Sequence, residues 1–291
     1  MPFKIKTFGW RNKTLDQISR IDEGLTILGH ELVNENPEIA YSNNDMYDDV
    51  LEFANRQNER PFVILNVLDL QIGNLDYELE KVKNQLLEAD LVTCISESVK
   101  VQIKQALNIE AEVIHNPVKD FFLDGASEKK FLFLYVGRAN DPRKRFGLIR
   151  DSLSRHEKLK ASLIVCGSEN PDFGFYNGVI SDENLNFLYN SSKFLLLPSR
   201  FEGLGLPMIE AMITGTIPIV CDDNPTALEF CPKEFITAPN PDDLLKKIIE
   251  LGEDYDNFRK IAIEYGEKYK ILMNKERVAQ NIIDLYRKAK C

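Results

Sequence analysis

Two glutamates and three glycines lie close together in the segment LPSRFEGLGLPMIEAMITGTIPIV, residues 197–220. The apolar run up to Pro198 predicts the end of a strand, and Gly203 and Gly205 predict a loop. Pro207 suits the first turn of a helix, where a missing backbone N–H costs nothing. A helix start offers unbonded N–H groups and the positive end of the helix dipole, so it favours an anion. The segment therefore predicts a phosphate-binding unit, although it has neither the G-K-[ST] of a Walker A loop nor the dinucleotide fingerprint.

The two carboxylates of this segment are placed for hydrogen bonds to hydroxyl groups. Glu210 follows the helix start and can accept hydrogen bonds from vicinal hydroxyls such as those of a ribose, whereas Glu202 precedes the loop and can face a sugar ring. Both residues also have an ordinary structural interpretation. Glu210 can stabilise a helix N-terminus, and Glu202 can be a solvated acid of a loop.

A second segment, YVGRANDPRKRF at 135–146, concentrates positive charge in an acidic chain. The protein has 291 residues and a formal net charge of −10, which argues against a general nucleic-acid binder. Arg138, Arg143, Lys144 and Arg145 nevertheless form a local basic cluster. A solvated charged turn is the ordinary interpretation, but cations beside the positive end of a helix dipole are unfavourable unless an anion binds there. The cluster therefore indicates a site for a small anionic ligand.

Short β-rich runs alternate with amphipathic stretches along the chain, which predicts an α/β protein with parallel sheets and crossover helices. The strand candidates are 3–8, 62–67, 91–96, 112–115, 131–136, 162–166, 194–198 and 216–221. The helix candidates are 14–29, 44–58, 77–88, 97–107, 146–157, 182–191, 207–214 and 241–252.

The polar stretch DFFLDGASEKK at 120–130 precedes a fresh apolar strand and marks a domain boundary. We predict a first domain over 1–122, a second over 123–254, and terminal helices over 255–291. Ligands of such doubly wound sheets bind beyond the carboxyl ends of the strands, so two successive units predict a cleft between them.

Residues 202–220 fit the frame EGxGLPxxEAMxxGxPxV almost throughout and resemble the hallmark of glycosyltransferase family 4, retaining enzymes of the GT-B fold among the glycosyl transferases of group 1. The strand and G-R pair of 135–146 are similar to those of the family. So are the strand, helix and strand of 178–199 and the end of a first domain at 89–118. The resemblance implies two Rossmann-like domains facing across a cleft, with acceptor binding in the first, nucleotide-sugar binding in the second, and C-terminal helices crossing back to the first.

The resemblance also implies residue roles. Arg138 and Lys144 would hold the donor diphosphate and neutralise the charge of the leaving nucleotide, so that no metal or other cofactor is required. Glu202 would contact the donor sugar and Glu210 the ribose, while Val179 would lie at the base. The implied catalytic residues are Glu202, Arg138 and Lys144; the implied donor-binding residues are Gly137, Arg138, Arg143, Lys144, Gly167, Val179, Glu202, Gly203, Leu204, Gly205, Leu206 and Glu210. Transfer would run from a UDP- or GDP-sugar to a saccharide, lipid-linked or other hydroxyl acceptor, with retention of anomeric configuration.

The first domain departs from the family pattern. Its first loop has a single Gly9 followed by the bulky Trp10, and many relatives carry a His-Asp pair where this chain has Leu68 and Asp69. Trp10, Asn66 and Asp69 are the acceptor-side candidates, with a strand-end turn as the alternative interpretation of the last two. The acceptor itself is not predicted.

The remaining sequence features bear on location and on rival functions. Five widely spaced cysteines without a C-x-x-C pair indicate a reducing compartment, and strand-sized apolar runs predict no transmembrane segment. We expect a cytoplasmic protein, whose contact with a membrane, if it has one, is peripheral. The alternatives are a catalytically silent nucleotide-sugar-binding partner and a GT-B relative such as a sugar-phosphate synthase or an epimerase. A purely structural module would leave the two charged segments unexplained.

Overall fold

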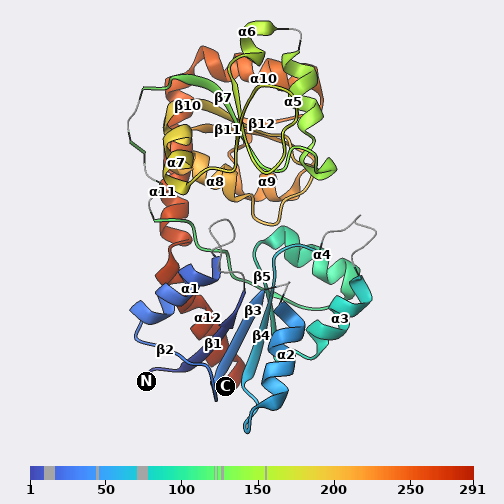
Figure 1. Ribbon diagram of the computed structural model, residues 1–291, viewed down its shortest axis with the longest axis vertical. Coiled ribbons are helices and arrows are strands. Elements are labelled where there is room, and N and C mark those ends of the chain that lie inside the picture. The colour runs from blue at the N-terminus through green and yellow to red at the C-terminus, as the bar shows by residue number, and fades with distance from the viewer. Residues whose placement is uncertain are drawn as a thin grey trace. The chain divides into compact units, whose positions relative to one another are not determined.

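The computed structural model describes residues 1–9, 17–43, 46–70, 78–120, 122, 124–125, 128–154 and 156–291 (Figure 1). The chain divides into two compact units, one formed by residues 1–119 together with 272–291 and the other by residues 120–271. The terminal helices that the sequence predicts over 255–291 are thus shared between the units. Its first helix counts with the second unit and its last helix with the first.

The first unit is built on a six-stranded sheet in which all strands are parallel, in the order β2-β1-β3-β4-β5-β6. The strands are β1 (Lys4–Phe8), β2 (Glu31–Leu32), β3 (Ile39–Asn43), β4 (Phe62–Val67), β5 (Leu91–Cys94) and β6 (Glu112–Val113). The helices of this unit are α1 (Gln17–Ile27), α2 (Tyr47–Arg56), α3 (Leu79–Leu87), α4 (Glu97–Leu107) and α12 (Lys275–Lys290).

The core of the first unit joins the two ends of the chain. Ile21 and Leu25 of α1 share one buried apolar cluster with Ile282 and Ile283 of α12. Gly24 lets these two helices approach closely, because a Cβ atom at this position would lie 2.3 Å from the carbonyl oxygen of Lys275. The last helix is therefore an integral part of the first unit.

The second unit contains another parallel sheet of six strands, in the order β12-β11-β10-β7-β8-β9. The strands are β7 (Phe131–Val136), β8 (Leu163–Cys166), β9 (Phe175–Gly178), β10 (Ser192–Leu197), β11 (Ile217–Cys221) and β12 (Ile236–Thr237). The helices and 3-10 turns are η2 (Pro142–Lys144), α5 (Phe146–Leu153), α6 (Glu157–Lys160), α7 (Asp182–Ser191), α8 (Leu206–Ile213), α9 (Pro225–Phe230), η3 (Lys233–Phe235), α10 (Pro241–Glu253) and α11 (Tyr255–Leu272). The two sheets with their crossover helices confirm the predicted α/β class.

The strand order of the second unit defines where a ligand can bind. The chain runs from β7 outward through β8 to β9, and then crosses back to β10 on the other side of β7. The order is that of a dinucleotide-binding sheet, and the carboxyl ends of β7 and β10 flank its switch point. The loops that leave these two strands are the ones that carry the charged segments found in the sequence.

Local side-chain chemistry fixes where several of these helices begin. Ser181 caps α7 by accepting a hydrogen bond from the backbone N–H of Asn184, and Asn240 caps α10 in the same way at Asp243. Helix α11 lies directly against the end of α8. Gly266 permits this close contact, since a Cβ atom there would be 2.5 Å from the carbonyl oxygen of Met212. Contact with α8 explains why 255–271 belongs to the second unit.

Lys129 anchors the chain at the start of the second sheet. Its Nζ lies 3.3 Å from Oγ1 of Thr216 and 3.4 Å from the carbonyl oxygen of Tyr189. Burial, with a smaller contribution from the positive charge of Arg259, lowers the pKa of Lys129 to about 8 from an ordinary 10.5.

Because the folded state releases this proton at lower pH than the unfolded state does, the unfolded state binds more protons above about pH 8, and stability rises there with pH. We expect the melting temperature of the wild type, relative to that of Lys129→Met, to rise between about pH 8 and about pH 10. The exposed Lys130→Met serves as the control in the same thermal denaturation series. Parallel curves for wild type and Lys129→Met would show that the ammonium is not perturbed.

Candidate functional site

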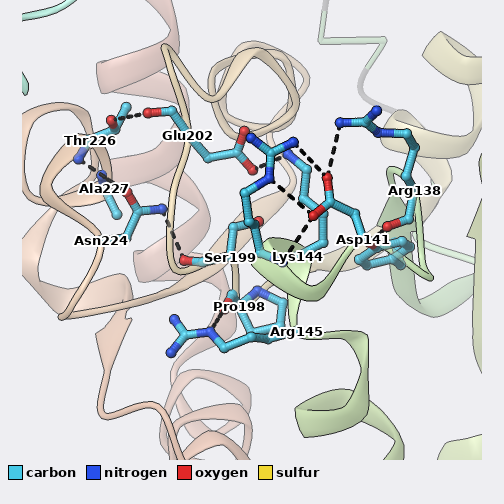
Figure 2. A network of polar contacts seen from close by, with 12 residues as sticks. Arg138, Asp141, Lys144, Arg145, Pro198, Ser199, Glu202, Asn224, Thr226 and Ala227 are labelled. Carbon is cyan, nitrogen blue, oxygen red and sulfur yellow. Dashed lines mark hydrogen bonds and ion pairs between the residues drawn. The ribbon is translucent and has the colours of Figure 1, made fainter. Parts of the chain in front are cut away.

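The candidate site lies at the carboxyl ends of β7 and β10, where residues 137–145 meet residues 198–206 (Figure 2). The backbone N–H of Arg200 donates to the carbonyl oxygen of Arg143 at 2.8 Å, which joins the two segments directly. The structure therefore brings together the basic cluster and the glycine loop, which are about sixty residues apart in the sequence.

Lys144 and Glu202 form an ion pair at the centre of this site. Nζ of Lys144 is 2.6 Å from Oε1 of Glu202, and the two side chains are only 19% and 11% exposed. Taking two charges out of water is expensive, and an ion pair offsets this cost only with good geometry and additional hydrogen bonds. A nearly buried pair at a sheet switch point is thus a feature that stability alone does not require.

Asp141 organises the two arginines of the cluster (Figure 2). Its carboxylate accepts hydrogen bonds from the backbone N–H, Nε and Nη2 of Arg143 at 2.9, 3.1 and 2.9 Å, and from Nη2 of Arg138 at 3.0 Å. Burial raises the pKa of Asp141, but hydrogen bonds from Arg143 and the guanidinium charges outweigh burial, and the net pKa is lowered. Arg143 is held by this carboxylate, whereas Arg138 remains 58% exposed.

The glycine loop ends at the N-terminus of α8. Gly205 adopts a left-handed conformation with φ of 72°, which lets the chain turn sharply into the helix, and no side chain caps this end. Among the residues that the structure describes, none accepts a hydrogen bond from the backbone N–H groups of Gly205 and Leu206. Leu204 is 3% exposed and anchors the loop, while Gly203 precedes it. The helix start retains the donors that an anion would need.

Glu210 lies deeper, on α8, and is 7% exposed. Its Oε2 accepts a hydrogen bond of 3.1 Å from the hydroxyl of Tyr189. Burial and the neighbouring charge of Glu210 raise the pKa of Tyr189 far above its ordinary value, so the tyrosine remains a neutral donor. The carboxylate is oriented by this contact.

The remaining donor-side candidates come from the ends of β7, β8 and β9. Gly137 and Gly167 approach each other so closely that a Cβ atom at Gly167 would lie 1.9 Å from the carbonyl oxygen of Gly137. Val179 follows β9 and is 62% exposed. The absence of a side chain at Gly167 thus lets the chain after β8 pack directly against the backbone that precedes Arg138.

The acceptor-side candidates Trp10, Asn66 and Asp69 belong to the first unit of the chain. Trp10 lies outside the residues that the structure describes. Asn66 is fully buried; its Nδ2 donates to Oδ1 of Asn43 at 3.2 Å, and its Oδ1 accepts from Oγ1 of Thr93 at 2.9 Å. These contacts favour the structural interpretation of Asn66. Asp69 follows the same strand and is partly buried.

Several residues of the site were not predicted from the sequence. Asp141 could have been found, because an Asp followed by a Pro is a common start of a helical turn. Three further residues follow β11 and hold the two charged segments, namely Asp223, Asn224 and Thr226. Their contacts are with distant parts of the chain, so the local sequence does not predict them. Among the described residues, no group of three or more His, Cys, Asp or Glu side chains is placed to hold a metal ion.

Fold and site together define an α/β protein whose second Rossmann-like unit presents a basic cluster, a helix start and two carboxylates at its switch point. The family model described as glycosyl transferases group 1 matches residues 119–269, just over half of the chain. The chain belongs to this family of glycosyltransferases.

Curated relatives agree with this membership. The putative glycosyltransferase 41 of Sulfolobus islandicus filamentous virus is 32% identical over 152 residues, which are 52% of this chain and 45% of that protein. The O-antigen chain mannosyltransferase RfbU of Salmonella typhimurium is 28% identical over 201 residues, 60% of this chain and 55% of that protein. The chain thus matches about half the length of these relatives.

Solved structures share the fold over nearly the whole chain. A glycosyltransferase from Rickettsia africae has a TM-score of 0.74 at 14% identity and covers 99% of this chain and 98% of its own. Anabaena Alr3699/HepE in complex with UDP also has a TM-score of 0.74, at 13% identity, covering 99% and 100%. The likeness confirms the GT-B fold class. No helix in the described part of the chain has the length and apolar character needed to cross a membrane.

Proposed function

We propose that the protein transfers a hexose from a nucleoside diphosphate sugar to a hydroxyl acceptor, with retention of anomeric configuration and without a metal ion. The proposal rests chiefly on the Lys144–Glu202 pair, which lies beside a helix start whose N–H groups lack partners among the described residues. An ammonium and backbone donors suit a diphosphate, while a carboxylate suits sugar hydroxyls.

The position of each group supports the following assignment of donor contacts. The diphosphate lies between the α8 amides and the cations Arg138 and Lys144, and Glu202 accepts hydrogen bonds from the donor sugar. Glu210, one helical turn beyond the α8 start, accepts hydrogen bonds from the ribose hydroxyls, and the base lies near Val179 after β9. Arg143 contributes through Asp141 because its guanidinium is bound to that carboxylate.

In the reaction, the bond between the anomeric carbon and the β-phosphate oxygen breaks, and the nucleoside diphosphate leaves with the electron pair. Arg138 and Lys144 stabilise the growing negative charge, which is commonly the largest catalytic contribution. The acceptor oxygen attacks from the face that the phosphate leaves, and its proton passes to the departing phosphate. These two cations supply the charge that a metal ion would otherwise bring. Glu202 and Glu210 serve donor binding and are not the acid and nucleophile of a glycosidase.

The relatives support a proposal for the donor and acceptor classes. A protein of the same fold, Anabaena Alr3699/HepE, was crystallised with UDP-glucose, and two curated relatives are O-antigen chain mannosyltransferases. We therefore propose a UDP- or GDP-hexose as donor and a saccharide or lipid-linked saccharide as acceptor. The four buried cysteines are free thiols, which suits the reducing cytoplasm as the place of the reaction.

The experiment is a calorimetric donor screen with UDP-glucose, UDP-galactose, UDP-N-acetylglucosamine and GDP-mannose in the presence of EDTA, followed by donor hydrolysis and an acceptor panel. We expect one nucleotide class to bind and to be hydrolysed slowly, and the product of transfer to retain the anomeric configuration of the donor by NMR. Binding without hydrolysis or transfer would identify a silent nucleotide-sugar-binding partner instead. No binding of any donor would refute the proposal.

Arg138→Ala is expected to weaken binding of the preferred nucleoside diphosphate about 10-fold, because a hydrogen bond to a charged group contributes about 1.5–3 kcal/mol and half-exposure reduces it. Arg150→Ala on α5 is the matched control, since Arg150 is 56% exposed and Arg138 is 58% exposed. Isothermal titration with both variants and the wild type measures the difference. Equal affinities for all three would remove Arg138 from the site.

A further inference from the structure

Arg145 has a backbone conformation that its residue type does not favour. Its φ is 48° and its ψ is 42°, in the left-handed region where a Cβ atom is unfavourable and glycine is usual. The residue ends η2 and begins α5, directly after Lys144. An arginine in this conformation is maintained only if its side chain makes contacts that glycine could not.

The guanidinium of Arg145 makes such contacts with two other segments of the second unit. Nη1 and Nη2 donate to the two carboxylate oxygens of Asp223 at 2.8 and 2.7 Å. Nε donates to the carbonyl oxygen of Pro198 at 2.8 Å (Figure 2). The arginine side chain is 19% exposed. Hydrogen bonds from Arg145 lower the pKa of Asp223, which keeps this carboxylate ionised. The guanidinium of Arg145 is thus hydrogen-bonded to protein groups through all three of its nitrogen atoms.

Asp223 belongs to a short segment that also holds the other side of the site. Nδ2 of Asn224 donates to the carbonyl oxygen of Ser199 at 3.1 Å, and Oγ1 of Thr226 donates to the carbonyl oxygen of Glu202 at 2.6 Å. Asn224 and Thr226 are almost fully buried. The residues after β11 therefore hold the backbone of Glu202, and through Asp223 they also hold the residue next to Lys144.

We propose that Arg145 and Asp223 form a positioning pair that sets the ammonium of Lys144 against Glu202 and the diphosphate, without touching the substrate. The inference rests on the proposed function of Lys144 as a diphosphate ligand. A displacement of about 1 Å in a catalytic group can cost about 100-fold in rate. The pair replaces the flexibility of a glycine at position 145 with a fixed geometry.

The test compares Arg145→Gly, Asp223→Asn and the double variant with wild type. Glycine relieves the backbone strain, so we expect Arg145→Gly to melt within a few degrees of wild type while kcat falls about 10-fold or more. Affinity for the nucleoside diphosphate, which Arg138 and the α8 amides also hold, should change less than about 3-fold. Because the pair acts as a unit, the double variant should lose no more than the worse single variant. Asp222→Asn, at the exposed neighbouring position, is the control and should behave as wild type.

A second measurement does not depend on turnover. Nitrogen-15 NMR of lysine ammonium groups should show the Lys144 signal protected from exchange in wild type and in Asp222→Asn, and lost in Arg145→Gly. A wild-type kcat for Arg145→Gly, additive losses in the double variant, or a protected Lys144 signal in Arg145→Gly would each overturn the inference. Failure of the proposed function is distinguishable, since the wild type itself would then bind no donor while the NMR comparison still decides on the pair.

Discussion

Replacing Lys144 by methionine is expected to lower kcat for sugar transfer by about 100- to 1,000-fold, the loss that follows removal of one donor to a developing negative charge. The ammonium lies 2.6 Å from Glu202 in a largely buried position, where water cannot replace it at the leaving phosphate. Methionine retains the apolar length of the side chain, so packing is largely preserved. Steady-state transfer assays at saturating donor measure the effect.

Removing one partner of a nearly buried ion pair leaves the other charge uncompensated, which can destabilise the fold. The effect of Lys144→Met on stability must therefore be separated from its effect on kcat. The double variant Lys144→Met/Glu202→Gln carries no unpaired charge and should recover the melting temperature while kcat stays low. Lys158→Met on α6, at an exposed position, should match wild type in both. If kcat returned with the melting temperature in the double variant, the role of Lys144 would be structural.

Glu210→Gln is expected to weaken binding of the nucleoside diphosphate about 10- to 100-fold, because hydrogen bonds from ribose hydroxyls to a carboxylate contribute about 1.5–3 kcal/mol. The carboxylate is 7% exposed and is held by the hydroxyl of Tyr189 at 3.1 Å. Glutamine has nearly the same shape but offers a weaker acceptor. Titration calorimetry with UDP and GDP measures the loss.

Analogues without ribose hydroxyls isolate the contact. The wild type should bind the 2′,3′-dideoxy nucleotide as weakly as Glu210→Gln binds the natural one, and the variant should no longer distinguish the two. Tyr189→Phe removes the hydrogen bond to Glu210 but keeps the carboxylate, and a smaller loss of affinity is expected. A variant that still prefers the ribonucleotide by the wild-type ratio would contradict the assignment of Glu210.

The second unit was largely predictable from its sequence. Local sequence signals mark the position of each charged segment. An apolar strand precedes each one, and glycines and Pro207 mark the helix start. Because parallel strands end at one edge of a sheet, placing both segments after strands was enough to expect them together. The resemblance to family 4 added the residue roles.

Other parts depend on contacts between distant residues. Strand β3 was missed because IAYSN ends in polar residues, yet all five residues are buried, and Asn43 is satisfied by Asn66 of the neighbouring strand. The contact between Arg145 and Asp223 spans 78 positions, and nothing near Arg145 suggests its left-handed backbone. Tertiary hydrogen bonds, rather than local propensity, decide such positions.

The shared core of α1 and α12 has a consequence for synthesis of the chain. Domains usually fold in order as they leave the ribosome, at about 5–20 residues per second. Here residues 1–119 are made first, but Ile282 and Ile283, which complete their core, appear only after the whole of 120–271 has been translated. The first unit therefore lacks part of its core for a time on the order of ten seconds at these rates, and the surface of α1 that packs against α12 stays uncovered for that time.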